Sequence, residues 1–166
     1  MKHRVWLPDD FDPPESVETG RFTLRILGPA DLAKDFDAYM SSIDHLLGAF
    51  GPGESWPEGV TIEDALIDVC WCNLEFKLRS SCSYGVHAVD ESEELGSLYV
   101  FPCTKQGYDA QLVCWVRASA AARGFDDELF QWGKHWVAEA WPFKSVAYPG
   151  REIDWDIWAN LADKPV

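Results

Sequence analysis

A strand, a loop of small residues and the start of a helix follow one another over residues 107–132, an arrangement that can bind an anion. The segment reads GYDAQLVCWVRASAAARGFDDELFQW. The first amides of a helix have no partner inside it, and the helix dipole adds positive charge there, so both point at a ligand in the loop. Three acids, Asp126, Asp127 and Glu128, stand at this helix start. They either repel an anionic ligand or stabilise their own helix by about 0.3 to 1 kcal/mol.

The strand in this segment carries polar side chains, although a central strand is usually apolar on both faces. Alternation along residues 108–117 puts Asp109 and Gln111 on the same face. They are candidates for lining a cleft, with Asp109 as a general base and Gln111 as a substrate contact. The alternative is that both lie at an exposed strand start. Cys114 has no histidine near it in the sequence, which favours a buried thiol over a nucleophile.

The chain holds nine tryptophans, and aromatic rings in an acidic protein favour cationic ligands. The last third contains Trp132, Trp136, Trp141, Trp155 and Trp158. The four-residue spacing of Trp132 and Trp136 favours core packing as the alternative. Trp56 lies in a loop rich in glycine and proline, GPGESWPEG, and we expect it to be more exposed than the others.

Length and charge limit the possible functions. A chain of 166 residues with 47% hydrophobic content predicts one domain over residues 21–166, preceded by an acidic, proline-rich arm over residues 1–20. The net charge of -14 argues against nucleic acid and anionic membranes as partners. We expect a small-molecule amine or a cationic ligand, and a monomer or homodimer. The chain contains neither an apolar run of membrane-spanning length nor a signal-peptide pattern, which predicts a cytoplasmic protein.

Cysteines and histidines do not form a metal-ligand pattern in this sequence. The cysteines are Cys70, Cys72, Cys82, Cys103 and Cys114, and the histidines are His3, His45, His87 and His135. The cysteines lack the C-x-x-C pairs of zinc and redox sites, and the histidines are scattered. We therefore expect reduced cysteines and no metal.

Hydrophobic periodicity predicts the elements that position these residues. Strands are expected at 21–27, 84–89, 95–101, 108–117 and 145–148, and helices from Asp31, at 43–49, 62–79, 125–140 and 151–161. The resulting order, β-α-α-β-β-β-α-β-(α), predicts an α/β fold in which a mixed sheet packs against helices as an α+β sandwich.

This element order, with RFTLRILGPADL near the start and LGSLYVFP and QLVCWVR before a helix, resembles the GNAT superfamily of N-acyltransferases over residues 21–148. The resemblance implies a mostly antiparallel central sheet flanked by helices, with acetyl-CoA or another acyl-CoA as co-substrate. It also implies that acyl-CoA lies where two strands separate, with the pantetheine arm on the first strand and the diphosphate in the following loop. The residues implied to contact acyl-CoA are Cys114, Trp115, Val116, Arg117, Arg123 and Gly124.

The diphosphate loop departs from the pattern of the family, [QR]-x-x-G-x-[GA]. Residues 121–126 read AARGFD, so Arg123 and Gly124 are present and Asp126 replaces the second small residue. A carboxylate about 4 Å from a phosphate charge costs about 1 kcal/mol in water and about 4 kcal/mol at an effective dielectric constant of 20. The chain is thus expected to be either an N-acetyltransferase acting on a small amine or a catalytically inactive GNAT-like module. Such a module binds a cationic or aromatic ligand or a protein partner, and dimerisation through exposed apolar surface is a third hypothesis.

Transfer of an acyl group to an amine needs a base for the ammonium proton and an acid for the departing thiolate. Asp109 is the candidate base from its place on the strand, and Tyr148 is the candidate acid from its position at the end of the strand over residues 145–148. The resemblance places the region of Trp56 beside the acceptor site, which makes Trp56 a candidate substrate contact. The usual final two strands of the family are not evident after Tyr148. The acceptor pocket is therefore expected to differ from that of the family.

Overall fold

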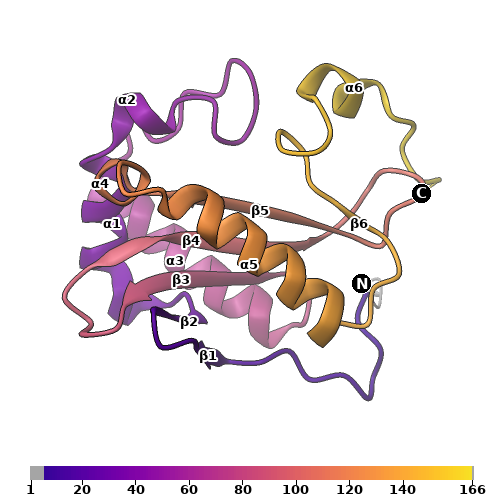
Figure 1. Cartoon of the computed structure of the whole chain (residues 1–166), viewed down its shortest axis with the longest axis horizontal. Helices are drawn as coiled ribbons and strands as arrows, with labels where there is room; N and C mark the ends of the chain where they lie inside the picture. Colours follow the sequence, from indigo (N-terminus) through magenta and orange to yellow (C-terminus); the bar gives the residue numbers. More distant parts are fainter. Residues whose placement is uncertain (1–5, 166) are drawn as a thin grey trace.

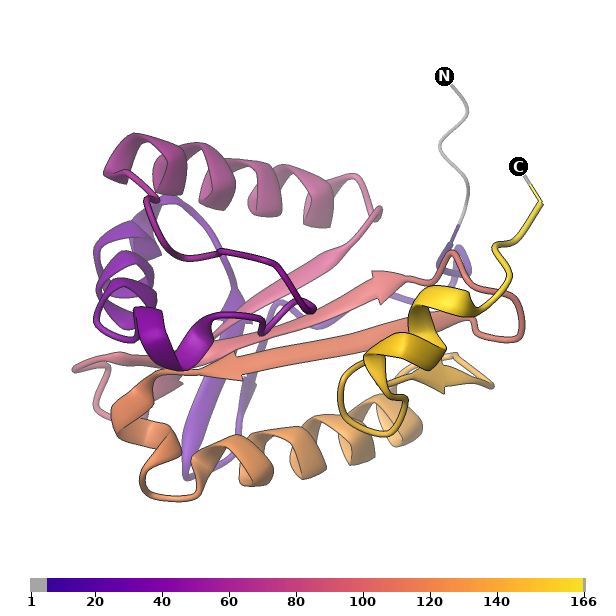
Figure 2. The ribbon, with the colours of Figure 1, turned by 90° about the horizontal axis from the view of Figure 1, so that it is seen from above.

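The computed structural model describes residues 6–165, which form one six-stranded sheet with helices on both faces (Figures 1 and 2). The strands are β1 (Ser16–Glu18), β2 (Phe22–Ile26), β3 (Cys82–Ala88), β4 (Glu94–Pro102), β5 (Ala110–Val116) and β6 (Val146–Ala147). The helices are the 3-10 helix η1 (Pro29–Asp31) and the α-helices α1 (Leu32–Met40), α2 (Ile43–Leu46), α3 (Ile62–Lys77), α4 (Ala118–Ala121), α5 (Phe125–Ala140) and α6 (Trp155–Asn160). His3 lies outside the described residues.

The strands follow the order of the sequence across the sheet, from β1 at one edge to β6 at the other. All neighbouring pairs are antiparallel except β5 and β6, which are parallel and are connected through α5. The predicted mixed, mostly antiparallel sheet flanked by helices is therefore confirmed. After β6 the described residues form α6 and isolated β-bridges, and they add no further strand to the sheet.

Helices α1 and α3 cover one face of the sheet, and α5 lies along the other, as the view from above shows (Figure 2). Close packing fixes α5 through Gly133. A Cβ atom at this position would lie 2.7 Å from Leu98 Cδ1 and 3.3 Å from Leu112 Cδ2. Because contacts below 3 Å force a shift, glycine lets the helix approach β4 and β5 closely. The first turn of α5 is thereby held near the end of β5.

The N-terminal segment is more ordered than its sequence pattern suggests. The rings of Trp6 and Phe143 stack at 5.4 Å, and the ring of Phe11 lies 5.2 Å from that of Trp141, so Trp6 and Phe11 anchor this segment to the domain. Between these anchors and the first long strand, residues 16–18 pair with β2 as an edge strand that periodicity did not predict. Within residues 6–165, none of the helices combines the length and the apolar character needed to cross a bilayer.

Candidate active site

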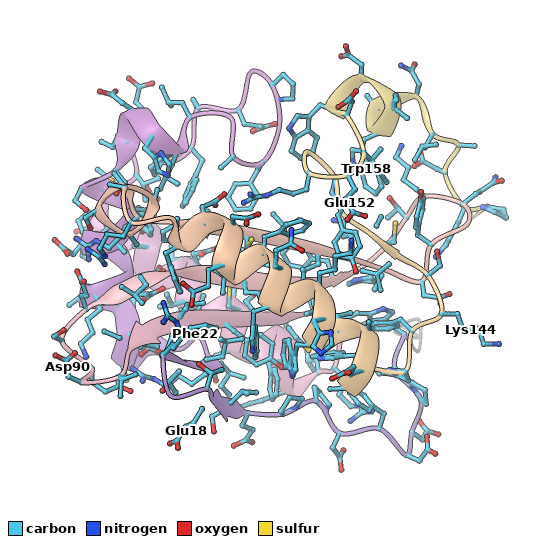
Figure 3. The ribbon with its side chains drawn as sticks, in the orientation of Figure 1. Glu18, Phe22, Asp90, Lys144, Glu152 and Trp158 are labelled. Carbon is cyan, nitrogen blue, oxygen red and sulfur yellow. The ribbon has the colours of Figure 1, made fainter. Side chains whose placement is uncertain are left out.

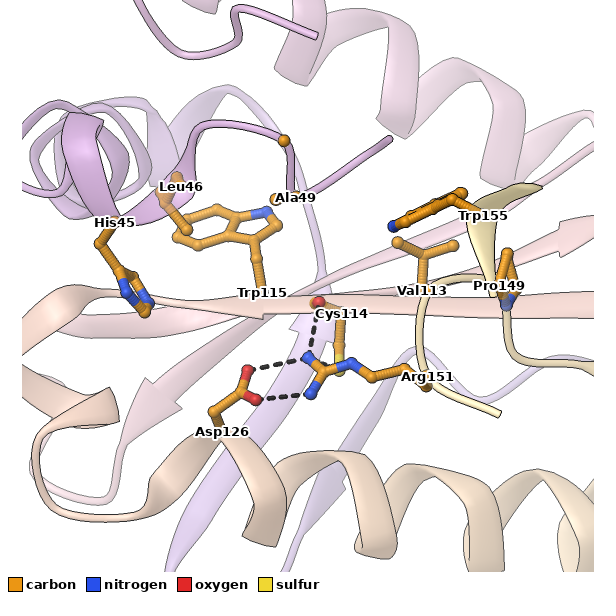
Figure 4. A pocket seen from close by; sticks show the side chains of 12 residues that line it. His45, Leu46, Ala49, Val113, Cys114, Trp115, Asp126, Pro149, Arg151 and Trp155 are labelled. Carbon is orange, nitrogen blue, oxygen red and sulfur yellow. Dashed lines mark hydrogen bonds and ion pairs between the residues drawn. The ribbon is translucent and has the colours of Figure 1, made fainter. Parts of the chain in front are cut away.

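Strands β5 and β6 pair through two residues each and then separate, which leaves an opening between them. Only Ala110 and Gln111 of β5 pair with β6, although β5 continues to Val116. A cavity of about 240 Å³ lies beside the remaining edge of β5, and its lining includes Val113, Cys114 and Trp115 (Figure 4). This is the separation of two strands that the resemblance implied for the acyl-CoA site.

Arg151 reaches across this opening and binds the carboxylate of Asp126, one of the three acids in the first turn of α5 (Figure 4). Its Nη2 donates to Asp126 Oδ1 at 2.8 Å and to the carbonyl oxygen of Cys114 at 3.3 Å. The hydrogen bonds from Arg151 lower the pKa of Asp126. Asp126 therefore does not cap its own helix, whose N-cap, Gly124, has no side-chain cap bond. A cation and an anion of the protein itself occupy the opening.

The loop between β5 and α5 uses most of its amides internally. The amides of residues 120–124 donate to carbonyl oxygens of residues 117–121, and the amide of Ala118 donates to Ser42 Oγ at 2.9 Å. Gly124 has φ +81°, a conformation that favours glycine. The first amides of α5, from Phe125 onward, have no acceptor inside the helix. These amides are therefore the ones in this segment that could donate hydrogen bonds to a bound anion.

Of the six residues implied to contact acyl-CoA, two line the cavity and four do not. Cys114 and Trp115 line the cavity, and burial raises the pKa of the Cys114 thiol to about 12, which keeps it protonated. Arg117 points toward α1, where it pairs with Asp37 Oδ2 at 3.1 Å. The remaining three, Val116, Arg123 and Gly124, do not line the cavity; Val116 is buried, and Arg123 and Gly124 are exposed in the loop.

Gly150, next to Arg151, determines where α6 packs. It has φ +75°, and a Cβ atom there would lie 2.5 Å from two ring carbons of Trp155. Trp155 begins α6 and lines the same cavity as Arg151. The absence of a side chain at Gly150 thus lets the indole ring close one side of the opening (Figure 4).

A second and larger cavity, of about 540 Å³, lies between α1, the loop that precedes α3, α3 itself and β4. Its acidic residues are Asp35, Glu54, Asp64, Asp68 and Glu75. Its aromatic residues are Tyr39, Phe50, Trp56, Trp71, Tyr99 and Phe101. No lysine, arginine or histidine of the described chain lines it. Carboxylates together with aromatic faces form an environment that attracts a cation.

Asp35 is the most buried acid of this cavity, with 3% of its surface exposed. Burial raises its pKa to about 6, against a hydrogen bond from Glu94 that lowers it. Burial and the neighbouring Asp35 raise the pKa of Glu94 well above its usual range. Ser97 Oγ donates to the same Glu94 carboxyl at 3.1 Å. The raised pKa of Glu94 favours its neutral form, so Asp35 is the acid of this pair that ionises first as the pH rises.

Trp115 separates the two cavities. It lines the first, and its Nε1 donates to the hydroxyl of Tyr99, in the second, at 2.9 Å. Its ring also lies 5.3 Å from that of Trp56, another residue of the second cavity. The two cavities are thus neighbours, and the side chain of Trp115 lies between them.

The predicted catalytic residues lie elsewhere. The carboxylate of Asp109 accepts the amides of Lys144 at 2.8 Å and Ser145 at 3.1 Å, which ties the start of β5 to β6. Lys144 stands at the end of the sheet opposite the β3–β4 turn that carries Asp90 (Figure 3). The ring of Tyr148 packs at 5.6 Å from that of Phe130. Neither Asp109 nor Tyr148 lines either cavity, and the catalytic roles of these two residues stay predictions.

The two predicted substrate contacts also differ in position. Trp56 is half-buried and lines the acidic and aromatic cavity. Gln111 is half-buried on β5, at its last pairing with β6, and lines neither cavity.

The described residues contain no group of three or more His, Cys, Asp and Glu side chains able to hold a metal ion. The five cysteines are free thiols.

Comparisons with known proteins support the fold by structure and not by sequence. No protein-family model matches the chain, and a search of curated proteins finds no match. The chain is similar to the ribosomal-protein-S5-alanine acetyltransferase of Vibrio fischeri, with TM-score 0.59 and 15% identity over 75% of this chain and 68% of the other. It is also similar to a GNAT-family acetyltransferase candidate of Bordetella pertussis, with TM-score 0.54 and 15% identity over 71% and 69%.

A third similar structure is an acetyltransferase of Agrobacterium tumefaciens, with TM-score 0.53 and 19% identity over 78% of this chain and 69% of the other. At sequence identities this low, the structural similarity establishes the fold and nothing further. From the sheet order, the opening between β5 and β6 and these similarities, we conclude that the chain has the fold of the GNAT superfamily.

Proposed function

We propose that this chain is an N-acyltransferase that transfers an acyl group from an acyl-CoA to a small amine. The observation that carries the proposal is the junction at Trp115, where an acidic and aromatic cavity meets the opening between β5 and β6. An acyl-CoA would supply the activated acyl group from the side of the opening. The acceptor would bind as an ammonium ion in the acidic cavity.

Asp35 supports the acceptor half of this proposal. A general base works best when its pKa lies near the working pH, and a pKa of about 6 meets this condition. The carboxylate of Asp35 would attract the ammonium ion and then accept its proton. The neutral amine would attack the acyl carbon and the carbon–sulfur bond would break. The proton that the nitrogen then loses would balance the proton that the sulfur gains, so that coenzyme A leaves as the thiol. Asp109 stays the alternative base, from the opposite end of β5.

The donor half fits acyl-CoA only in part. The free edge of β5 at Cys114, the first amides of α5 and the guanidinium of Arg151 suit a pantetheine arm and a diphosphate. Asp126 is unsuited to a diphosphate, because its negatively charged carboxylate lies at the start of α5, beside these amides and Arg151. Opening its ion pair, whose side chains are about one-third exposed, costs up to about 1 kcal/mol, and repulsion of the diphosphate adds about 1 to 4 kcal/mol. Acyl-CoA binding should therefore be about 5- to 5,000-fold weaker than with a small residue there.

The second candidate is an amine-binding module that performs no acyl transfer. The ion pair of Arg151 and Asp126 favours it, because the chain fills its own donor opening. This candidate uses the same acidic cavity and differs only in its response to acyl-CoA.

Calorimetric titration separates the two candidates. We expect acetyl-CoA at near-millimolar concentration to release or absorb heat with the wild-type protein, and small primary amines to bind as well. Heat with the amines but none with acetyl-CoA or longer acyl-CoAs would reject the transferase and leave the amine-binding module. Absence of heat with both ligands would reject both candidates.

A further inference from the structure

Helix α3 is apolar on the face that it turns away from the sheet. Its inner face is buried through Ala65, Val69, Cys72 and Phe76. On the outer side, exposed fractions are 43% for Ile62, 43% for Leu66, 68% for Ile67, 59% for Trp71, 43% for Leu74 and 48% for Leu78. Cys70 lies among them and is the exposed cysteine of the chain. A contiguous apolar surface of this kind on a charged protein indicates an interaction site.

We propose that this outer face of α3 binds the same face of a second copy of the chain. Ile62, Leu66, Cys70, Leu74 and Leu78 recur at four-residue steps and form a ridge with Cys70 at its centre. Two such ridges pack against each other in the commonest crossing of helices, at about −50°. A two-fold axis at Cys70 puts Leu66 of each copy against Leu74 of the other.

Charge complementarity within the ridge supports a second copy as the partner. Glu63 and Lys77 lie seven residues before and seven residues after Cys70, on the exposed face of the helix. The same two-fold axis brings Glu63 of each copy to Lys77 of the other, so one register gives two ion pairs. Neither residue makes an ion pair within the described part of its own chain.

The net charge of the chain sharpens this argument. With 28 acidic and 14 basic residues, most surfaces of two copies repel each other. The outer face of α3 avoids that repulsion, because its centre is apolar and the two-fold axis brings an acidic residue of each copy to a basic residue of the other. Trp71 belongs to this face and also lines the acidic cavity, so the second copy would lie beside the cavity. The inference rests on α3 itself and does not depend on the proposed function.

Sedimentation equilibrium over a range of protein concentrations tests the dimer. We expect a reversible monomer–dimer equilibrium for the wild type. Leu66→Glu or Leu74→Glu should raise the dissociation constant at least about tenfold. Val89→Glu places the same charge at an apolar residue of the β3–β4 turn, 59% exposed, and should leave the equilibrium unchanged. A wild-type protein that stays monomeric throughout, or equal weakening by all three variants, would overturn the proposal.

Charge exchange and cross-linking test the register. Glu63→Lys and Lys77→Glu should each weaken the dimer, and the double variant should recover most of the loss because the pairs form again with reversed sign. A short bis-maleimide should join the two copies through Cys70, and Cys70→Ser should abolish the product, since the other four cysteines are buried. A dimer whose double variant shows no recovery, or which Cys70 does not cross-link, would contradict the two-fold axis at Cys70.

Discussion

Arg151 and Asp126 form a two-pronged ion pair across the opening between β5 and β6, and this pair stands beside the free amides at the start of α5. Both side chains are about one-third exposed, at 28% and 37%. Because water screens a pair at this depth, its opening costs little free energy, and the larger obstacle to an anionic ligand is the charge of Asp126 itself. We therefore expect the carboxylate of Asp126 to decide whether the opening accepts a diphosphate.

Replacing Asp126 by alanine should convert the opening into a better acyl-CoA site. The change removes the repulsion and frees Arg151 to bind the diphosphate, and alanine is one of the two small residues of the family pattern. We expect at least about a fivefold rise in affinity for acetyl-CoA, measured by calorimetry. Asp127→Ala, which removes a neighbouring acid outside the pair, is the matched control and should change the affinity far less. Equal affinity in the two variants would mean that Asp126 is not the obstacle.

Cation binding in the acidic cavity should increase with pH. Asp35, with its pKa raised to about 6, is neutral at pH 5 and ionised at pH 7, so the cavity gains a negative charge between these values. Tetramethylammonium keeps its charge throughout, which leaves the protein as the group that titrates. Its affinity should rise about tenfold from pH 5 to pH 7. Asp31, Asp68 and Glu94 are the other acids near Asp35.

The variant Asp35→Asn isolates this titration because the amide has a similar shape and no charge. It should bind the cation weakly with little dependence on pH. A wild-type pH dependence that survives in Asp35→Asn would assign the titration to another acid of the cavity, such as Asp68, whose pKa burial also raises.

The variant Asp109→Asn separates a structural from a catalytic role of Asp109. The side-chain oxygen of the new amide can still accept the backbone N–H groups of Lys144 and Ser145, so this variant should melt at nearly the same temperature as the wild type. Asp109→Ala loses both bonds and should be less stable by about 1 to 3 kcal/mol. With Asp35 as the base, Asp109→Asn should keep its turnover. Loss of turnover at unchanged stability would make Asp109 the base.

Gly150→Ala should move Trp155 and alter the donor opening. The added methyl group would meet the indole ring at 2.5 Å, and φ +75° is strained for alanine. Gly53→Ala is the control, since Gly53 has φ +82° and no atom within 4 Å of an added Cβ. The first variant should lose more stability in thermal unfolding, and its tryptophan fluorescence should change. Equal losses would show that backbone strain alone accounts for the effect.

The fold was predictable from the sequence because it depends on local periodicity. Alternation located β2 to β5, and the three- and four-residue spacing located α3 and α5 at nearly their observed bounds. Edge strand β1 was not predicted, because its three residues carry only one apolar side chain, Val17, and its pairing to β2 is set by tertiary contacts. Short elements of this kind have too few residues to show a period.

The site was less predictable, because it depends on contacts between distant residues. The composition of its loop singled out Trp56. Arg151, the partner of Asp126, lies 25 residues away in a segment without a hydrophobic period, so the ion pair could not be predicted. Asp35 did leave a signal in the sequence. It lies three residues after Leu32 and four before Tyr39, on the side of α1 that packs inward, where an acid needs a partner. That partner, Glu94, comes from β4 and could not be identified from spacing.

Release of free coenzyme A in the presence of an amine tests the proposed acyl transfer most directly. Wild-type protein and Asp126→Ala are incubated with acetyl-CoA and a panel of small primary amines, and the new thiol is measured with and without each amine. The account predicts amine-dependent release that is faster in Asp126→Ala and is lost in Asp35→Asn. Failure of every amine to increase thiol release in both the wild type and Asp126→Ala would contradict it.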